Sequence, residues 1–119
     1  MDSTIAPINI AICLKIANNN KEIASKLISM FIKELPEAQN DINKAYENND
    51  FIELKKHVHK LLGSSAYCGA SLIQRDLNEI SKHAIDNNDD KLKSSVESLN
   101  TNISKTMDFY RENANIDQI

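Results

Sequence analysis

The sequence predicts an all-α fold, an antiparallel four-helix bundle with a short additional N-terminal helix. Apolar residues recur at three- and four-residue steps through four long segments, as they do on the buried face of a helix. Short polar runs rich in asparagine separate these segments. The chain has only two glycines and two prolines, which leaves little turn chemistry for strands. Long amphipathic helices joined by short links favour antiparallel packing of neighbours.

The composition sets the class of protein and excludes several functions. A length of 119 residues suits one domain over 1–119, and 41% apolar with 26% charged residues is typical of soluble globular proteins. The net charge of −3 argues against nucleic acid as a partner. No apolar run approaches the ~20 residues of a membrane span, and no secretion-signal pattern precedes the first helix. We therefore expect a cytoplasmic protein without membrane insertion.

The two cysteines give no sign of a metal site. Cys13 and Cys68 lie far apart in the sequence and lack metal-ligand spacing, so two free thiols are expected, with a disulfide as the alternative. Each predicted helix has a single apolar stripe, and a monomer is therefore expected.

A short first helix is predicted over 7–17. Pro7 suits the first helical position, because its missing N–H costs nothing there. Isoleucines at four-residue steps give this segment a narrow apolar stripe: Ile8, Ile12 and Ile16. The asparagines of 18–20 end the helix and offer an N-cap for the next one.

The second helix is predicted over 21–47. Its apolar stripe consists of Ile23, Leu27, Met30, Phe31, Leu35, Ala38, Ile42, Ala45 and Tyr46. Pro36 lies within this pattern, where it removes one backbone hydrogen bond and should kink the helix. Two helices with a break at Pro36 are the alternative, although the unbroken apolar phase favours a kink.

The third helix is predicted over 51–68. Asp50 and Glu53 have the three-residue offset of a capping box, and Gly69 can adopt the left-handed conformation that follows a helix. The buried face should carry Leu54, Val58, Leu61 and Ser65.

Two further helices complete the bundle, over 72–86 and 90–112. Ser71 and Gln74 form a second capping box at the start of the fourth helix. The buried stripes are Ile73, Leu77, Ile80 and Ala84 in the fourth helix, and Leu92, Val96, Leu99, Ile103, Met107 and Tyr110 in the fifth.

One face of the third helix carries residues suited to chemistry. At ~100° per residue, His59 lies about 120° from the middle of the apolar stripe, and Gly63 lies one turn later on the same exposed face. Lys56 and Lys60 occupy the neighbouring exposed sector. A mid-helix glycine costs ~1 kcal/mol relative to alanine, so a reason for the missing side chain is expected beside His59.

These residues fit a histidine that carries a phosphoryl group. Neutral imidazole is a good nucleophile, and Gly63 leaves room for the phosphoryl group and a close partner. Lysines stabilise negative charge as point charges, and phosphoryl transfer needs mainly positioning and charge neutralisation. The plain alternatives are a solvated surface histidine at His59, a helix–helix contact at Gly63 and a solvated lysine face.

The other histidines give weaker candidates. His57 and His59 are separated by about 200° on a helix, so they cannot hold one metal ion together, and no metal site is expected. His57 should pack at the edge of the bundle, and His83 on the fourth helix should be exposed.

The segment from His59 to Ala70 resembles the signature of histidine-containing phosphotransfer (HPt) domains. That signature has an apolar residue two positions after the histidine, a glycine four after it, small residues next and a second glycine ten after it, as Leu61, Gly63 and Gly69 stand here. The similarity in layout extends from about Ile8 to Tyr110 and is greatest to the C-terminal HPt modules of tripartite hybrid sensor kinases.

The resemblance implies a phosphorelay intermediate. His59 would accept a phosphoryl group from a receiver-domain aspartyl phosphate and pass it to the receiver of another response regulator. Gly63 would clear space for it. The chain itself would need no cofactor, since Mg²⁺ belongs to the receiver. The sequence contains no Gly-rich phosphate loop for ATP, so no autokinase activity is expected. A cytoplasmic module of a membrane-bound kinase is one form such a domain takes.

Two positions depart from the family pattern. Leu62 stands where many members have lysine, and Ser81 stands where some have glutamine. We therefore assign the charge-neutralising role to Lys56 or Lys60, and expect Leu62 and Ala66 to form an apolar docking patch for a receiver. A helical binding module without phosphotransfer is the alternative function, and a metal-binding or hydrolytic bundle comes third.

Overall fold

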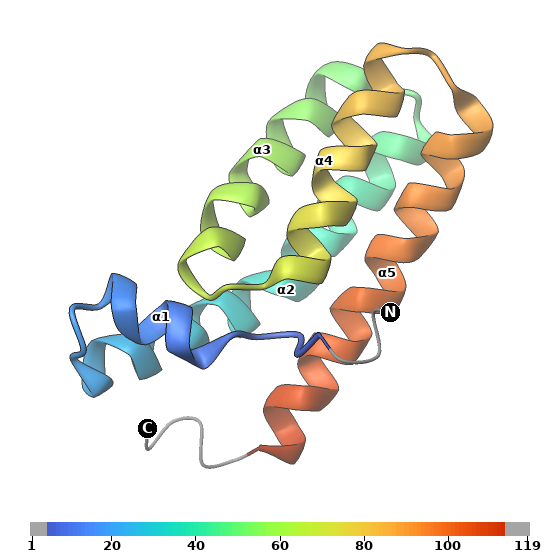
Figure 1. The fold of residues 1–119 in the computed structure, drawn as a ribbon. Helices are drawn as coiled ribbons and strands as arrows, with labels where there is room; N and C mark the ends of the chain where they lie inside the picture. Colours follow the sequence, from blue (N-terminus) through green and yellow to red (C-terminus); the bar gives the residue numbers. More distant parts are fainter. Residues whose placement is uncertain (1–4, 114–119) are drawn as a thin grey trace.

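Four long helices pack side by side, and a short fifth lies against one end of them (Figure 1). The structure is a computed structural model that describes residues 5–113. Its helices in chain order are α1 (Ile10–Ile16), α2 (Lys21–Glu47), α3 (Phe51–Tyr67), α4 (Ser71–Ile85) and α5 (Asp89–Glu112). The predicted bundle with an additional N-terminal helix is confirmed, and no strand occurs in the described part of the chain.

The apolar stripes of the long helices meet in one core. α2 packs against α3 and α5, and α4 packs against the same two helices. Burial of apolar surface is the main favourable term in such packing. The largest fully buried side chains include Ile28, Leu35, Ile42, Leu54, Val58, Leu61, Ile73, Leu77, Ile80, Leu99 and Ile103. No helix within 5–113 is long and apolar enough to cross a membrane.

Asparagine and aspartate set most helix boundaries. At four helix starts the capping side chain accepts a hydrogen bond from the backbone N–H three residues later, which satisfies a donor without an intrahelical partner. These caps are Asn9, Asn20, Asp50 and Asn88. Asparagines also adopt the left-handed backbone of the connections, which this residue tolerates better than most: Asn18, Asn19, Asn49 and Asn87.

One predicted helix start and one predicted cap are wrong. α1 begins at Ile10, because Asn9 caps it, and Pro7 lies before the helix. α4 begins at Ser71 with Ala70 as its N-cap, so Ser71 and Gln74 form no capping box. Ala70 is fully buried beside the connection from α3, and its carbonyl accepts the Gln74 N–H instead.

The buried face of α2 differs from its predicted stripe near the start of the helix. Ile23 and Met30 are 47% and 66% exposed, whereas Ala24 and Ile28 are buried. α1 packs on the first part of α2, so the face of α2 that carries Ala24 and Ile28 is buried there. α2 is continuous through the exposed Pro36, so the alternative of two helices is wrong.

The two cysteines are buried free thiols that join three helices. Cys13 Sγ donates to the Ala24 carbonyl and Cys68 Sγ to the Leu27 carbonyl, each at 3.5 Å. Burial raises the pKa of Cys13, and burial together with the nearby Cys13 raises the pKa of Cys68 to about 12.

Gly69 permits close contact between α1 and the end of α3. Its φ of +57° lies in the left-handed region, as predicted for the residue after this helix. A Cβ at Gly69 would lie 2.8 Å from Asn9 Cβ, and the Asn9 N–H donates to the Gly69 carbonyl at 3.1 Å. Only glycine fits both the conformation and the space.

Replacing Gly69 by alanine should therefore destabilise the fold. We expect Gly69→Ala to lower the free energy of unfolding by about 1–3 kcal/mol, measured by urea denaturation, because it adds left-handed strain and a clash with Asn9. Gly63→Ala is the matched control. No atom lies within 4 Å of its added Cβ, so removing a mid-helix glycine should stabilise by up to ~1 kcal/mol. Equal effects of the two changes would contradict this packing.

The buried thiols should resist alkylation. With its pKa raised to about 12, Cys68 holds almost no thiolate near neutral pH, and burial blocks access to it. Iodoacetamide at about pH 8 should label neither Cys13 nor Cys68 in the native protein, and both after denaturation, as read by mass spectrometry. Native labelling at the rate of a free thiol would show that this contact is open.

Candidate functional site

The exposed face of α3 brings together the residues singled out from the sequence. His59, Gly63 and Ala66 are exposed, whereas the opposite face is buried in the core. That buried face consists of Leu54, Val58, Leu61 and Ser65, the four residues predicted for it. The rotation of the helix deduced from its periodicity is therefore confirmed, and His59 points away from the bundle.

α3 holds His59 on a rigid support. Asp50 accepts the Glu53 N–H at the start of the helix, and the turn at Gly69 closes its other end. His59 lies near the middle of the 17-residue helix, away from both ends. A side chain on a packed helix is positioned more sharply than one on a loop, so the imidazole has a defined approach direction.

Open space surrounds Gly63. A Cβ built at this residue meets no atom within 4 Å, so no contact inside the described chain requires a glycine here. This observation excludes the helix–helix contact that was the plain alternative for Gly63. The bare backbone instead leaves room one helical turn beyond His59 for something from outside the chain.

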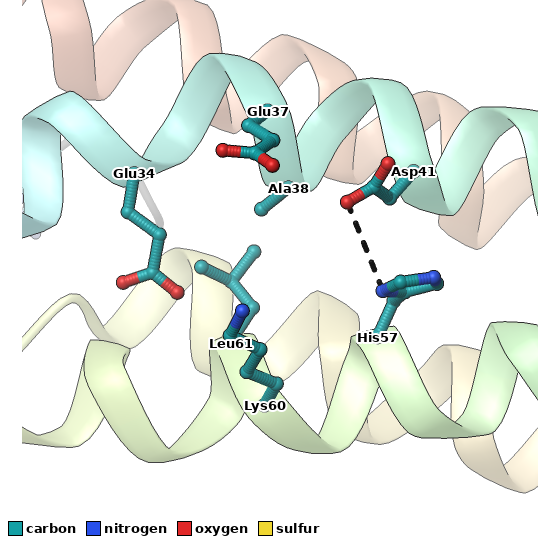
Figure 2. Close-up of a pocket in the computed structure, with 7 residues that line it drawn as sticks. All are labelled: Glu34, Glu37, Ala38, Asp41, His57, Lys60 and Leu61. Carbon is teal, nitrogen blue, oxygen red and sulfur yellow. Dashed lines mark ion pairs between the residues drawn. The ribbon is translucent and has the colours of Figure 1, made fainter.

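The two lysines differ in their surroundings. Lys56 and Lys60 are both exposed, but Lys60 also lines a small pocket between α2 and α3 with Glu34 and Glu37. Figure 2 shows the Lys60 side chain reaching from α3 toward the carboxylates of α2. The lysines thus place positive charge on either side of His59 along the helix, and α2 places negative charge beside Lys60.

His57 faces the seam between α2 and α3 rather than the exposed face. Its Nδ1 lies 3.8 Å from Asp41 Oδ2, as Figure 2 shows, and its Nε2 lies 3.2 Å from Glu53 Oε2. The side chain is 25% exposed, as suits the bundle edge predicted for it. Neither partner was predicted from the sequence, although Glu53 stands four residues earlier on the same helix.

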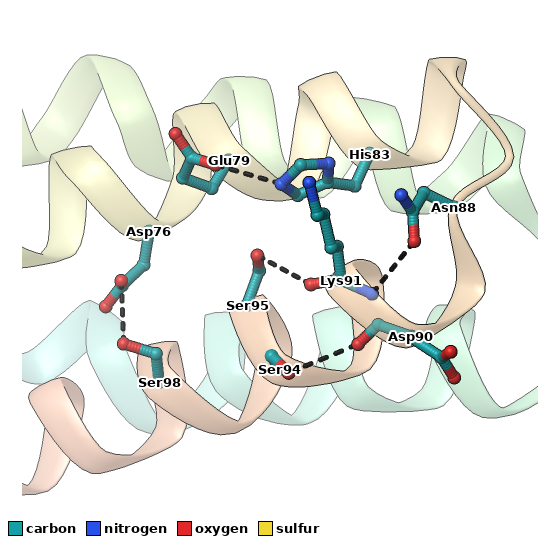
Figure 3. Close-up of polar contacts among 9 residues, drawn as sticks. All are labelled: Asp76, Glu79, His83, Asn88, Asp90, Lys91, Ser94, Ser95 and Ser98. Carbon is teal, nitrogen blue, oxygen red and sulfur yellow. Dashed lines mark hydrogen bonds and ion pairs between the residues drawn. The ribbon is translucent and has the colours of Figure 1, made fainter.

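His83 is buried, so its predicted exposure is wrong. The residue is 8% exposed, because α5 packs over this part of α4. Its Nε2 is hydrogen-bonded to Glu79 Oε2 at 2.9 Å, while its Nδ1 is buried without a partner (Figure 3). The same seam buries Asp76, whose carboxylate accepts from Ser98 at 2.8 Å and Asn102 at 2.6 Å.

Leu62 and Ser81, the two departures from the family pattern, are both half-buried. Ser81 lines a groove between α3 and α4 together with Val58, the residue before His59. Leu62 packs against the core and has only part of its side chain accessible. Neither side chain carries charge, so the positive charge near His59 comes from other residues of α3. These are Lys56 and Lys60, singled out from the sequence, and the exposed Lys55 one helical turn before His59, which was not.

Several exposed apolar side chains were not expected from the sequence. Four residues that periodicity assigned to the stripes of the first two helices are exposed: Ile12, Ile16, Ile23 and Met30. Tyr67, at the end of α3, is 54% exposed. α1 lies against this end of α3. No three His, Cys, Asp or Glu side chains within residues 5–113 are placed to hold a metal ion.

The comparisons with known proteins agree with the fold. The sequence pattern of the Hpt domain family matches residues 26–108, which contain α3, α4 and nearly all of α2 and α5. A crystal structure of the HPT domain from the Hpt sensor hybrid histidine kinase of Shewanella is similar to the chain. That match has 26% identity and a TM-score of 0.70, and covers 89% of this chain and 95% of the other. No curated protein matches the sequence.

The family match covers more than half of the chain, and the five-helix fold agrees with it. The matched region also contains the exposed histidine, the open glycine and the lysines that the helix face brings together. The chain therefore belongs to the Hpt domain family, the phosphotransfer domains of two-component signalling.

Proposed function

We propose that the chain is a phosphorelay intermediate in which His59 carries the phosphoryl group. The observation that supports this most strongly is the open space at Gly63 beside an exposed imidazole on a rigid helix. A solvated surface histidine does not explain a glycine that costs helix stability and makes no internal contact. A phosphoryl group with a closely docked partner explains both features.

The transfer step needs only a nucleophile and a well-placed donor. The lone pair of an imidazole nitrogen of His59 attacks the phosphorus of a receiver aspartyl phosphate. The P–N bond forms as the P–O bond to the aspartate breaks, and the carboxylate leaves with the electron pair. The reverse reaction, with the aspartate of another receiver as nucleophile, passes the group on. The receiver brings Mg²⁺, so α3 supplies only the acceptor and its surroundings.

Lys56 and Lys60 neutralise the charge that gathers on the phosphoryl oxygens. They stand three residues before and one residue after His59, in exposed positions that a phosphoryl group on the imidazole can approach. They take the place of the lysine that many family members have at the Leu62 position. The carboxylates of α2 beside Lys60 partly offset its charge, so Lys56 contributes the larger share.

The receiver docks on apolar surface next to His59. Ala66 is exposed two turns beyond His59, and Leu62 borders the same face. Tyr67, next to Ala66 in the sequence, and Ile12 and Ile16 on α1 are further exposed apolar side chains. Exposed apolar side chains gathered beside a reactive group are typical of a protein interaction site.

A labelling experiment tests the role of His59. The protein is mixed with a phosphorylated receiver and Mg²⁺, and should acquire acid-labile, alkali-stable label. His59→Gln should abolish that label, because the glutamine amide cannot accept a phosphoryl group as the imidazole nitrogen does. His57→Gln is the matched control and should retain the label, since His57 faces Asp41 and Glu53. Label that persists in His59→Gln, or that never appears in the wild type, would falsify the proposal.

A second experiment tests the lysines separately. Lys56→Ala and Lys60→Ala should each slow transfer by roughly three- to tenfold, about 0.7–1.4 kcal/mol of lost charge stabilisation, with the larger effect at Lys56. Lys93→Ala is the control, because Lys93 is exposed on α5 and should leave the rate unchanged. Rates are measured by single-turnover transfer from the phosphorylated receiver. Unchanged rates in both variants would show that neither lysine stabilises the phosphoryl charge, without affecting the role of His59.

A further inference from the structure

A second apolar surface lies between the first half of α3 and the last half of α4. It is a groove of about 240 Å³ whose walls include Ile52 and Val58 from α3 and Ile80, Ala84 and Ile85 from α4. An apolar cavity of ~150 Å³ already accepts a benzene molecule, so this groove has room for more than one aliphatic side chain. It lies at the opposite end of α3 from α1 and Tyr67.

The rim of the groove is unusually apolar for a protein surface. Ile52 is 83% exposed, Ile85 is 74% exposed and Phe51 is 39% exposed. Single exposed apolar residues are ordinary, but three around one apolar groove form a continuous surface of the kind that binds another protein. Within residues 5–113, no segment covers these side chains.

The charges around the groove favour an acidic occupant. Lys55 is the one charged residue among the described residues that line it. Lys56 follows on α3 and Lys82 is exposed on α4, whereas Asp50 stands just before Phe51 and Asp86 just beyond Ile85. The three lysines exceed the two aspartates by one charge, in contrast to the net charge of −3 of the whole chain. Carboxylates on a partner would complement the lysines.

The shape of the groove favours a helix. A trough between two packed helices accepts the side chains that an amphipathic helix presents at positions i, i+3, i+4 and i+7. The walls contain aliphatic residues, which match aliphatic side chains on such a helix. Lys55 then stands where an Asp or Glu beside the apolar face of the bound helix can reach it.

We propose that this groove binds an amphipathic, acidic helix of a partner protein. Lys55 precedes His59 by one helical turn and Val58 by three residues, so the helix would lie next to the phosphoryl-accepting histidine. It would leave the α1 side of α3 accessible to a receiver. The binding goes beyond phosphotransfer and does not depend on it, because it uses neither the imidazole nor Gly63.

A peptide selection tests this proposal. A displayed library of random peptides of about 16 residues, roughly four helical turns, is selected against the whole chain. The binding peptides should carry aliphatic residues at i, i+3 or i+4 flanked by Asp or Glu, and their affinity should fall with added salt. Their dissociation constants are then measured by fluorescence anisotropy.

Variants of the chain locate the binding site of these peptides. Ile52→Asp should weaken binding at least about tenfold, and Lys55→Glu several-fold. Lys93→Glu, on the outer surface of α5, makes the same charge change elsewhere and should have no effect. His59→Gln should bind as well as the wild type, so a failure of phosphotransfer and a failure of this proposal are distinguishable. If Ile52→Asp lowers the melting temperature, Ile85→Asp on α4 provides the same test from the other wall of the groove.

Three outcomes would overturn the proposal. The selection could yield no peptides of this pattern. Alternatively, selected peptides could bind equally well to the wild type, Ile52→Asp and Ile85→Asp, which would place them elsewhere on the chain. Finally, sedimentation could reveal self-association of the chain that Ile52→Asp abolishes, in which case a second copy of the chain occupies the groove.

Discussion

Burial of one stripe of α3 fixes the orientation on which the site depends. Leu54, Val58 and Leu61 are 0–1% exposed, and moving them out of the core would cost several kcal/mol. A helix with three such anchors cannot rotate, so every other residue of α3 has a fixed direction. His59 is turned to solvent because the residue before it and the second residue after it are held in the core.

The same constraint explains why two neighbouring histidines differ. His57 is turned toward α2, with Asp41 of α2 lying 3.8 Å from one ring nitrogen and Glu53 of α3 lying 3.2 Å from the other. His59 faces outward and has the open backbone of Gly63 one turn away. The chemistry proposed for His59 thus follows from helix geometry and from the missing side chain at Gly63. The lysines supply positive charge.

Local signals in the sequence were sufficient for most of the fold. α2 has the bounds predicted for it, because Asn20 caps its start and Asn48–Asn49 end it. The rotation of α3 also followed from periodicity alone. Contacts between distant segments could not be predicted in this way. His83 is buried because α5 covers it. Met30 is exposed because α1 packs against a neighbouring face of α2 and buries that face instead.

His59 and Gly63 at the centre of the site could be predicted from the sequence, whereas most of the surrounding contacts could not. A glycine inside an amphipathic pattern is a local signal, so His59 and Gly63 could be paired from spacing. The position of Lys60 beside Glu34, and the groove walled by Ile52 and Ile85, depend on how α3 meets α2 and α4.

Locating the phosphoryl group by NMR tests the central claim most directly. The account predicts a phosphorus–nitrogen coupling to the His59 ring with the rings of His57 and His83 unmodified, and a coupling to either of those rings would contradict it.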